Sequence, residues 1–127
     1  MTCFWDGIIS SLSIDDLNIL ELIGPTPIQL AKQLQYKNIE TKSILWNNTK
    51  LTTNQLAENS IHIQDYLSQS VHNGYLCSIC DPFLCLLCEL LKTNIKHTYL
   101  GNTMYYEYPS STKTLCFCSN RGHFWKL

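Results

Sequence analysis

The pattern of apolar residues changes once along the chain, near Ile95, and this change restricts the fold more than any other feature of the sequence. Before that point, apolar residues recur at helical spacing, and the run from Phe4 to Leu12 predicts a helix that begins at about Cys3. After it, short alternating runs are separated by Gly, Pro and Asn, which is typical of strands. The predicted strands are residues 95–100, 104–108, 114–118 and 123–125. Helices followed by strands favour an α+β fold, in which a helical N-terminal half packs on a C-terminal antiparallel sheet.

Local signals mark where the helices begin. Ser, Thr and Asp side chains accept hydrogen bonds from the free N–H groups of a first helical turn, and proline fits the first helical position. These signals predict N-caps at Ser13, Thr26, Thr52 or Thr53, and Asp81. Asp81 would open the most apolar helix of the chain. Two further elements are expected: a short strand at residues 44–46, and a second helix at residues 60–67 after the one that Thr52 or Thr53 caps.

Size and charge narrow the range of functions. The chain has 127 residues, which suits one domain covering residues 1–127. Nine basic and ten acidic residues give a net charge of −1, so the basic excess of a typical nucleic-acid binder is missing. No apolar run approaches the roughly 18 residues of a membrane span, and the first residues lack the basic segment of a secretory leader. Seven cysteines, an odd number, favour free thiols and a cytoplasmic location.

A cysteine and a histidine at opposite ends of the chain form the first candidate site. Cys3 lies in the first turn of its predicted helix, where free N–H groups and the helix dipole favour a thiolate. His123 lies on the last predicted strand, directly after Gly122, which leaves space for a substrate backbone. A thiolate nucleophile needs an imidazole nearby to share its proton and later to protonate the leaving group. An early helical cysteine and a late strand histidine follow the order of papain-like cysteine proteases.

Three segments of the sequence carry a resemblance to a known family. Residues 3–9 read CFWDGII, residues 73–95 contain NGY, DPFL and a leucine-rich helix that ends in TNI, and residues 115–125 read LCFCSNRGHFW. They resemble the catalytic helix, the middle part and the terminal strand and histidine of ovarian-tumour (OTU) deubiquitinases and related viral papain-like proteases. The resemblance spans nearly the whole chain, and the small size is similar to that of the compact viral members.

This resemblance implies an OTU-like, papain-like fold and the activity of a cysteine (thiol) protease. The chain would be a hydrolase of the deubiquitinase type, which removes ubiquitin or a ubiquitin-like modifier from its partners. Cys3 would be the nucleophile and His123 the general base and acid, with no cofactor and no metal. The resemblance also implies a viral protein that acts in the cytoplasm of a eukaryotic host.

The sequence departs from the family at two places. OTU enzymes usually have an aspartate three residues before the nucleophile, whereas only two residues precede Cys3. They also often place Asn or Asp two residues after the histidine to orient its ring, and Trp125 occupies that position. Asn120 or Ser119 is therefore the candidate to orient His123. Three aromatic residues are expected to shape the cleft: Trp5, Phe124 and Trp125.

Four further cysteines form a second candidate site. Cys77, Cys80, Cys85 and Cys88 make two CxxC pairs, a spacing at which thiolates can hold one tetrahedral zinc ion. A zinc-stabilised interaction domain is therefore one alternative. The two pairs are closer together than the roughly 15–20 residues that usually separate them in zinc sites. Cys85 and Cys88 also fall within an apolar helix, which favours buried free thiols.

A non-catalytic binding module is the other alternative. Such a module would keep the same fold and bind ubiquitin or another protein, either through the cleft or through a tyrosine-rich hairpin. The tyrosines of this hairpin are Tyr99, Tyr105, Tyr106 and Tyr108.

Overall fold

The computed structural model describes residues 2–127, and in this part of the chain it shows a mixed α and β architecture. The α-helices are α1 (Cys3–Ser11), α2 (Ile14–Leu20), α3 (Pro27–Tyr36), α4 (Thr53–Asp65) and α5 (Pro82–Leu91), with the 3₁₀ helix η1 (Ser68–Asn73) before α5. The strands are β1 (Leu45–Trp46), β2 (Thr49–Lys50), β3 (Asn94–Tyr99), β4 (Asn102–Glu107), β5 (Thr114–Ser119) and β6 (Phe124–Lys126). The α+β class predicted from the sequence is therefore confirmed.

The predicted capping residues begin their helices. The side chains of Ser13, Thr26 and Thr52 each accept a hydrogen bond from the backbone N–H of the residue three positions later. The side chain of that later residue accepts the backbone N–H of the capping residue in turn. Asp81 accepts two backbone N–H groups at the start of α5. The prediction of two helices between residues 52 and 67 is wrong, because a single helix, α4, runs unbroken from Thr53 to Asp65. It contains no proline or glycine that would interrupt a helix.

The strands form one mixed sheet in the order β2-β1-β4-β3-β5-β6. The predicted antiparallel C-terminal sheet is wrong at one pair, because β5 runs parallel to β3. The reason lies in the connection between β4 and β5, which passes the start of β3. There the Asn94 side chain accepts the N–H of Tyr108 and donates to the carbonyl of Ser111. The connection therefore delivers β5 to the other side of β3, and β5 then runs in the same direction as β3.

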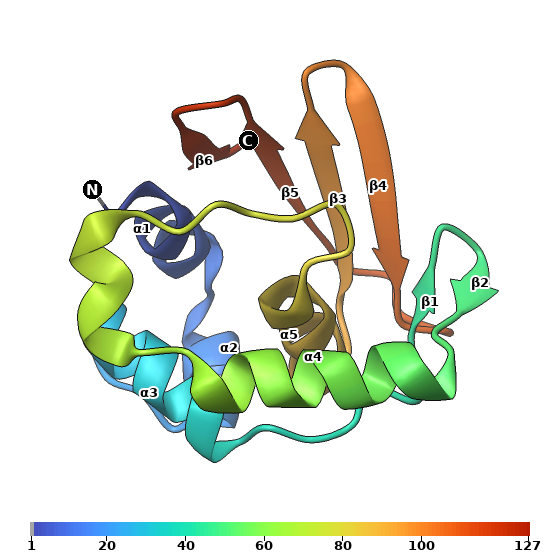
Figure 1. Cartoon of the computed structure of the whole chain (residues 1–127), viewed down its shortest axis with the longest axis horizontal. Coiled ribbons are helices and arrows are strands. Elements are labelled where there is room, and N and C mark those ends of the chain that lie inside the picture. The colour runs from blue at the N-terminus through green and yellow to red at the C-terminus, as the bar shows by residue number, and fades with distance from the viewer. Residues whose placement is uncertain (1) are drawn as a thin grey trace.

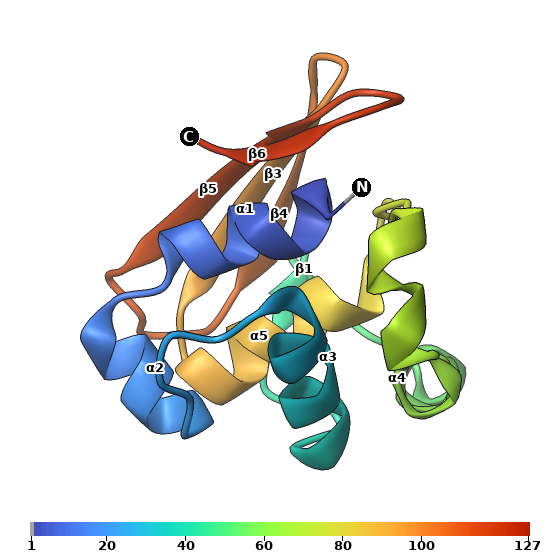
Figure 2. The same ribbon diagram turned by 90° about the vertical axis from the view of Figure 1, so that its left-hand side faces the viewer.

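The α-helices lie on one face of the sheet (Figures 1 and 2). At the centre of this layer is α5, of whose ten residues eight are buried. Strand residues that face the helices are buried, namely Ile95, His97, Met104, Tyr106, Leu115, Phe117 and Phe124. No α-helix within residues 2–127 is long and apolar enough to cross a membrane.

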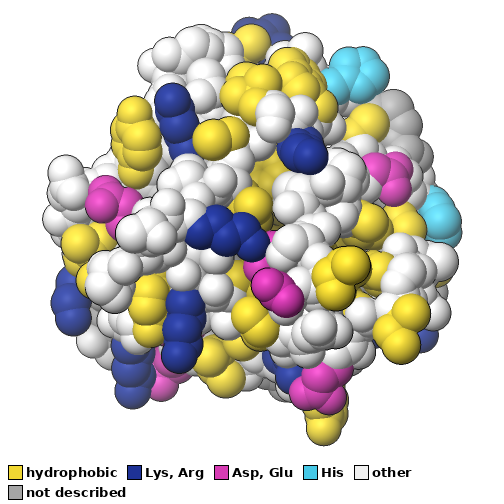
Figure 3. Space-filling view, turned by 180° about the vertical axis from the view of Figure 1, so that it is seen from behind, with side chains coloured by type: hydrophobic (Ala, Val, Ile, Leu, Met, Phe, Trp, Pro, Cys, Tyr) yellow, Lys and Arg dark blue, Asp and Glu magenta, His cyan; other side chains and the backbone are white. Residues whose placement is uncertain are grey.

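On the opposite face of the sheet, residues 2–127 place no helix (Figures 1 and 2). Tyr105 and Trp125 are its most exposed aromatic side chains, and Lys96, Cys116 and Cys118 alternate with the buried residues of their strands. The molecule seen from behind shows lysine and arginine side chains scattered among hydrophobic and polar ones, without a continuous basic stripe (Figure 3).

The first helix packs on the last strand, so the two ends of the chain meet (Figure 2). Gly7 of α1 faces the ring of Phe124 so closely that a Cβ atom at this position would lie 2.9 Å from its Cδ1 atom. The ring itself is held between Phe4, at a centroid distance of 4.9 Å, and Phe117, at 5.0 Å. Close packing through a glycine therefore sets the separation between α1 and β6.

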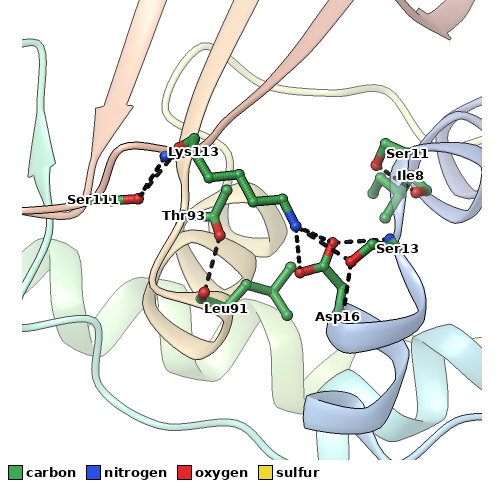
Figure 4. Close-up of polar contacts among 8 residues, drawn as sticks. All are labelled: Ile8, Ser11, Ser13, Asp16, Leu91, Thr93, Ser111 and Lys113. Carbon is green, nitrogen blue, oxygen red and sulfur yellow. Dashed lines mark hydrogen bonds and ion pairs between the residues drawn. The ribbon is translucent and has the colours of Figure 1, made fainter.

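An ion pair with a buried carboxylate fixes α2 against the connection between β4 and β5 (Figure 4). Asp16 accepts the N–H of Ser13 in the capping box of α2, and its two carboxylate oxygens lie 2.8 and 2.7 Å from Nζ of Lys113. Only 4% of the Asp16 side chain is exposed, so this pair is shielded from solvent on the acidic side. It anchors the connection that makes β5 parallel to β3.

Candidate active site

Cys3 is the first residue of α1, and the N-terminus of this helix has no side-chain cap. The hydroxyl of Thr2, at the N-cap position, donates to the carboxylate of Asp6 instead of accepting a backbone N–H. The first helical bond runs from the N–H of Asp6 to the carbonyl of Thr2. The N–H groups of Cys3, Phe4 and Trp5 therefore have no partner within the helix. Free donors and the positive end of a helix dipole lie next to the Cys3 sulfur.

His123 follows a tight turn between β5 and β6, and this turn is built on Asn120. Oδ1 of Asn120 accepts the N–H of Gly122 at 3.0 Å and that of His123 at 2.9 Å. The N–H of Asn120 donates to the carbonyl of His123 at 2.9 Å. Asn120 therefore fixes the backbone that carries His123, and its side chain acts on the turn rather than on the imidazole ring.

The structure brings Cys3 and His123 together, although 120 residues separate them in the sequence. The distance from Sγ of Cys3 to Nδ1 of His123 is 3.8 Å. Both residues line a surface cavity of about 260 Å³, called here the Cys3 cavity. Its lining consists of Cys3, Phe4, residues 73–77, Tyr99 and residues 119–124. Residues that carry a sulfur, an imidazole and free helical N–H groups thus border a space that is open to solvent.

Only one of the three aromatic residues expected to shape the cleft lines the cavity, namely Phe124. Trp5 is fully buried in the aromatic core, with its ring centroid 5.0 Å from that of Phe83. Trp125 points away from the helices, because neighbouring residues of a strand face opposite sides. Phe4 lines the cavity instead. Its place next to Cys3 in the sequence was the available signal, and the sequence prediction missed it.

A second cysteine and histidine lie at the same cavity. Cys77 belongs to the cavity lining, and its Sγ atom is 3.8 Å from Nδ1 of His97. Nε2 of His97 lies 2.6 Å from the hydroxyl oxygen of Ser119. Ser119 therefore contacts the ring of His97 and not that of His123. Burial lowers the pKa of His97, and burial together with the charge of Asp81 raises the pKa of Cys77 well above that of an ordinary thiol.

Asp81 anchors the cavity wall formed by residues 73–77. It is completely buried, and it accepts hydrogen bonds from Tyr75, from the N–H and hydroxyl of Ser78, and from two N–H groups of α5. The phenol oxygen of Tyr75 also lies 3.2 Å from Nε2 of His62. Burial raises the pKa of Asp81, whereas these five donors favour its charged form. The network holds Tyr75 and the residues beside it in place.

The four cysteines of the two CxxC pairs do not gather around one point. Among residues 2–127, no group of three or more His, Cys, Asp or Glu side chains is arranged to hold a metal ion. Cys85 and Cys88 are fully buried in α5, and burial raises the pKa of Cys88 to about 12. Cys80 and Cys85 approach each other with a sulfur–sulfur distance of 3.9 Å and are both free thiols. These residues pack in the core or beside it.

The geometry at Cys3 is suited to acyl transfer. A thiolate can attack a carbonyl carbon, the neighbouring imidazole can carry the proton, and the N–H groups at the start of α1 can bind the resulting oxyanion. Within residues 2–127, no side chain hydrogen-bonds the second ring nitrogen of His123. The arrangement is therefore a cysteine–histidine pair without a third residue on the imidazole ring. Comparisons of the chain with family models, with curated proteins and with solved structures gave no match.

Proposed function

We propose that this protein is a cysteine-dependent isopeptidase or protease that removes ubiquitin or a ubiquitin-like modifier. The observation that carries the proposal is the 3.8 Å approach of Cys3 Sγ to His123 Nδ1 at the edge of an open cavity. The choice of ubiquitin rests on the resemblance of the three segments to OTU enzymes. The OTU-like or papain-like form of the α+β fold belongs to the same proposal.

In the proposed reaction, His123 accepts the proton of the Cys3 thiol, and the thiolate attacks the carbonyl carbon of the scissile amide. The carbon–nitrogen bond breaks, and His123 gives its proton to the leaving amine. A thioester between Cys3 and the acyl group remains, and water activated by His123 hydrolyses it. The reaction needs no cofactor. Because His123 has no third residue on its ring, we expect a slow enzyme.

The proposed location is the reducing cytoplasm of a eukaryotic host, with a virus as the source. All seven cysteines are free thiols, which supports a reducing compartment. The viral source rests on the resemblance alone.

The test is incubation with a ubiquitin probe that carries a C-terminal electrophile, followed by measurement of the intact mass. Wild-type protein should gain the mass of one probe, and a Cys3→Ala variant should gain none. A Cys116→Ser variant is the matched control, since Cys116 is a half-exposed thiol on the opposite face of the sheet. An adduct that persists in Cys3→Ala, or no adduct with ubiquitin or its relatives, would reject the proposal.

A non-catalytic binding module is the second candidate function, and the open face of the sheet favours it. Tyr105 and Trp125 are 46% and 40% exposed on that face, and aromatic side chains of this kind are enriched at protein interfaces. Binding of unmodified ubiquitin that survives alkylation of all accessible thiols, without any probe adduct, would support this function over the enzyme.

A further inference from the structure

His97 is a buried histidine that the proposed reaction does not use. Its side chain is on the inner side of β3, and the residue is only 1% exposed. A buried imidazole is costly unless its ring nitrogens have partners, and both nitrogens of His97 do. A neutral imidazole carries one N–H and one lone pair. Of its two partners, Cys77 and Ser119, one therefore donates to the ring and the other accepts from it.

These two partners belong to two different segments that line the Cys3 cavity. Cys77 belongs to the wall formed by residues 73–77, and Ser119 is the last residue of β5, just before the turn that carries His123. The His97 ring also lies 5.5 Å from the ring of Phe124, the residue that follows His123. One buried side chain therefore contacts the wall on one side and both ends of the His123 turn on the other.

We propose, on the basis of the function given above, that His97 is a positioning residue for His123. Through the hydroxyl of Ser119 and the ring of Phe124 it holds the two ends of the 120–123 turn, and through Cys77 it holds the wall formed by residues 73–77. Asn120 closes the turn internally, so the position of His123 relative to Cys3 depends on where His97 holds Ser119. Such control matters because a misplacement of about 1 Å can slow a reaction by roughly 100-fold.

The same contacts assign a role to Cys77 that differs from that of Cys3. Burial and the nearby Asp81 carboxylate keep its sulfur protonated, so Cys77 acts as a thiol partner of the His97 ring and not as a second nucleophile. Alkylation at neutral pH should therefore report on Cys3, and Cys77 serves as an internal reference within the same cavity.

The test is the pH profile of Cys3 alkylation by iodoacetamide, followed by peptide mass spectrometry, in Ser119→Ala and Ser119→Thr. Removing the hydroxyl should loosen the His123 turn, so that His123 stabilises the Cys3 thiolate less. We expect the acidic limb of the profile to move to higher pH and the rate near pH 6.5 to fall about tenfold. Ser119→Thr retains a hydroxyl and should restore the rate to within about threefold. Thr98→Ala is the matched control, because Thr98 faces the other side of β3 and its hydroxyl contacts Thr103.

A purely structural role for the Ser119 hydroxyl predicts a different result. In that case Ser119→Ala lowers the melting temperature but leaves the pH profile of Cys3 in the folded protein unchanged, and the inference is wrong. If Cys3 of the wild type reacts no faster than Cys116, the proposed function itself fails. A normal wild-type profile that Ser119→Ala does not alter rejects only the role of His97.

A measurement on the wild type keeps the inference testable if Ser119→Ala does not fold. Ring ¹⁵N chemical shifts should show His97 as a neutral imidazole in one fixed tautomer at neutral pH, because both of its nitrogens have partners. Two exchanging tautomers of His97 would overturn the inference, since such a ring would not hold Ser119 in one position.

Discussion

Two cysteine–histidine pairs have the same sulfur–imidazole separation, and the cysteines of both line the same cavity, yet their surroundings differ in almost every respect. In both pairs the sulfur lies 3.8 Å from Nδ1 of the imidazole. Cys3 lies at an uncapped helix N-terminus, and His123 is exposed to solvent. Cys77 lies beside the carboxylate of Asp81, and His97 is buried beneath the cavity. A short distance between sulfur and imidazole is therefore not enough to identify a nucleophile.

The two sulfur atoms have different electrostatic surroundings. The Cys3 sulfur lies at a helix N-terminus with free N–H groups, whereas burial and the neighbouring charge of Asp81 raise the pKa of Cys77. The histidines follow the same division. Burial lowers the pKa of His97, which favours a fixed neutral ring suited to positioning. The ring of His123, in contrast, is exposed to solvent.

The His123→Ala variant is expected to reduce the difference in reactivity between Cys3 and Cys77 the most. Loss of the imidazole should slow Cys3-dependent hydrolysis about 100- to 10,000-fold, the usual contribution of general acid–base catalysis. Alkylation of Cys3 at neutral pH should also slow toward the low rate of Cys77. Both rates can be read from the same peptide digest after timed exposure to iodoacetamide. His72→Ala, at an exposed position outside the cavity lining, is the control and should keep the wild-type ratio. Equal alkylation of Cys3 and Cys77 in the wild type would contradict the contrast.

A smaller effect is expected from Gly7→Ala, which acts on the packing between α1 and β6. Helix propensity alone predicts a gain of up to about 1 kcal/mol for alanine at a helical glycine. Here the new Cβ would lie 2.9 Å from the Phe124 ring, which Phe4 and Phe117 hold from two sides. We therefore expect a net loss of about 1–3 kcal/mol in the free energy of unfolding, as is typical of overpacked cores.

The same substitution should change the reactivity of Cys3 but not that of Cys77. Since α1 carries Cys3 and Phe124 adjoins His123, alkylation of Cys3 should slow, whereas Cys77 should stay unreactive. Chemical denaturation and timed alkylation check the two parts. Ser10→Ala, an exposed position in the same helix, is the matched control. A stabilised Gly7→Ala protein would show that α1 and β6 can move apart at little cost.

Local signals in the sequence were sufficient to predict where the helices begin. Local signals and chain order also singled out Cys3 and His123, which the structure brings together. A cap at Ser13 or Thr26 depends only on residues within one turn, so it can be recognised without tertiary structure. The position of Trp5 was also accessible in principle. Two residues after Cys3, it lies about 200° further around the helix and so faces the core instead of the cleft.

The parallel strand pair and the second cysteine–histidine pair could not be predicted, because both depend on contacts between segments that are far apart in the sequence. The parallel pairing of β3 with β5 follows from the bonds that Asn94 makes to the connection after β4, more than ten residues away. The contact between Cys77 and His97 joins an irregular segment to a strand 20 residues later. Alternation in β3 indicates that His97 points toward the core, but it does not show which side chains contact its ring there.

The smallest effect is expected from Asp16→Asn, far from both cysteine–histidine pairs. Burial alone would raise the pKa of Asp16, but the hydrogen bonds from Lys113 and Ser13 outweigh it and hold the pKa below 3.8. A lowered folded-state pKa contributes stability above pH 3.8 that is lost as the pH falls through the folded-state value. The variant should therefore be about 1–2 kcal/mol less stable at pH 7, and this difference should shrink below about pH 4.

Urea denaturation at pH 7 and at pH 3 measures the expected difference for Asp16→Asn. Asp15→Asn is the matched control, because Asp15 is exposed in the same first turn and makes no ion pair with Lys113. The ratio of Cys3 to Cys77 alkylation should stay at the wild-type value in both variants. A changed ratio in Asp16→Asn would mean that general loosening of the fold alters the two thiols, so that their difference would not be set by the local charges around each sulfur.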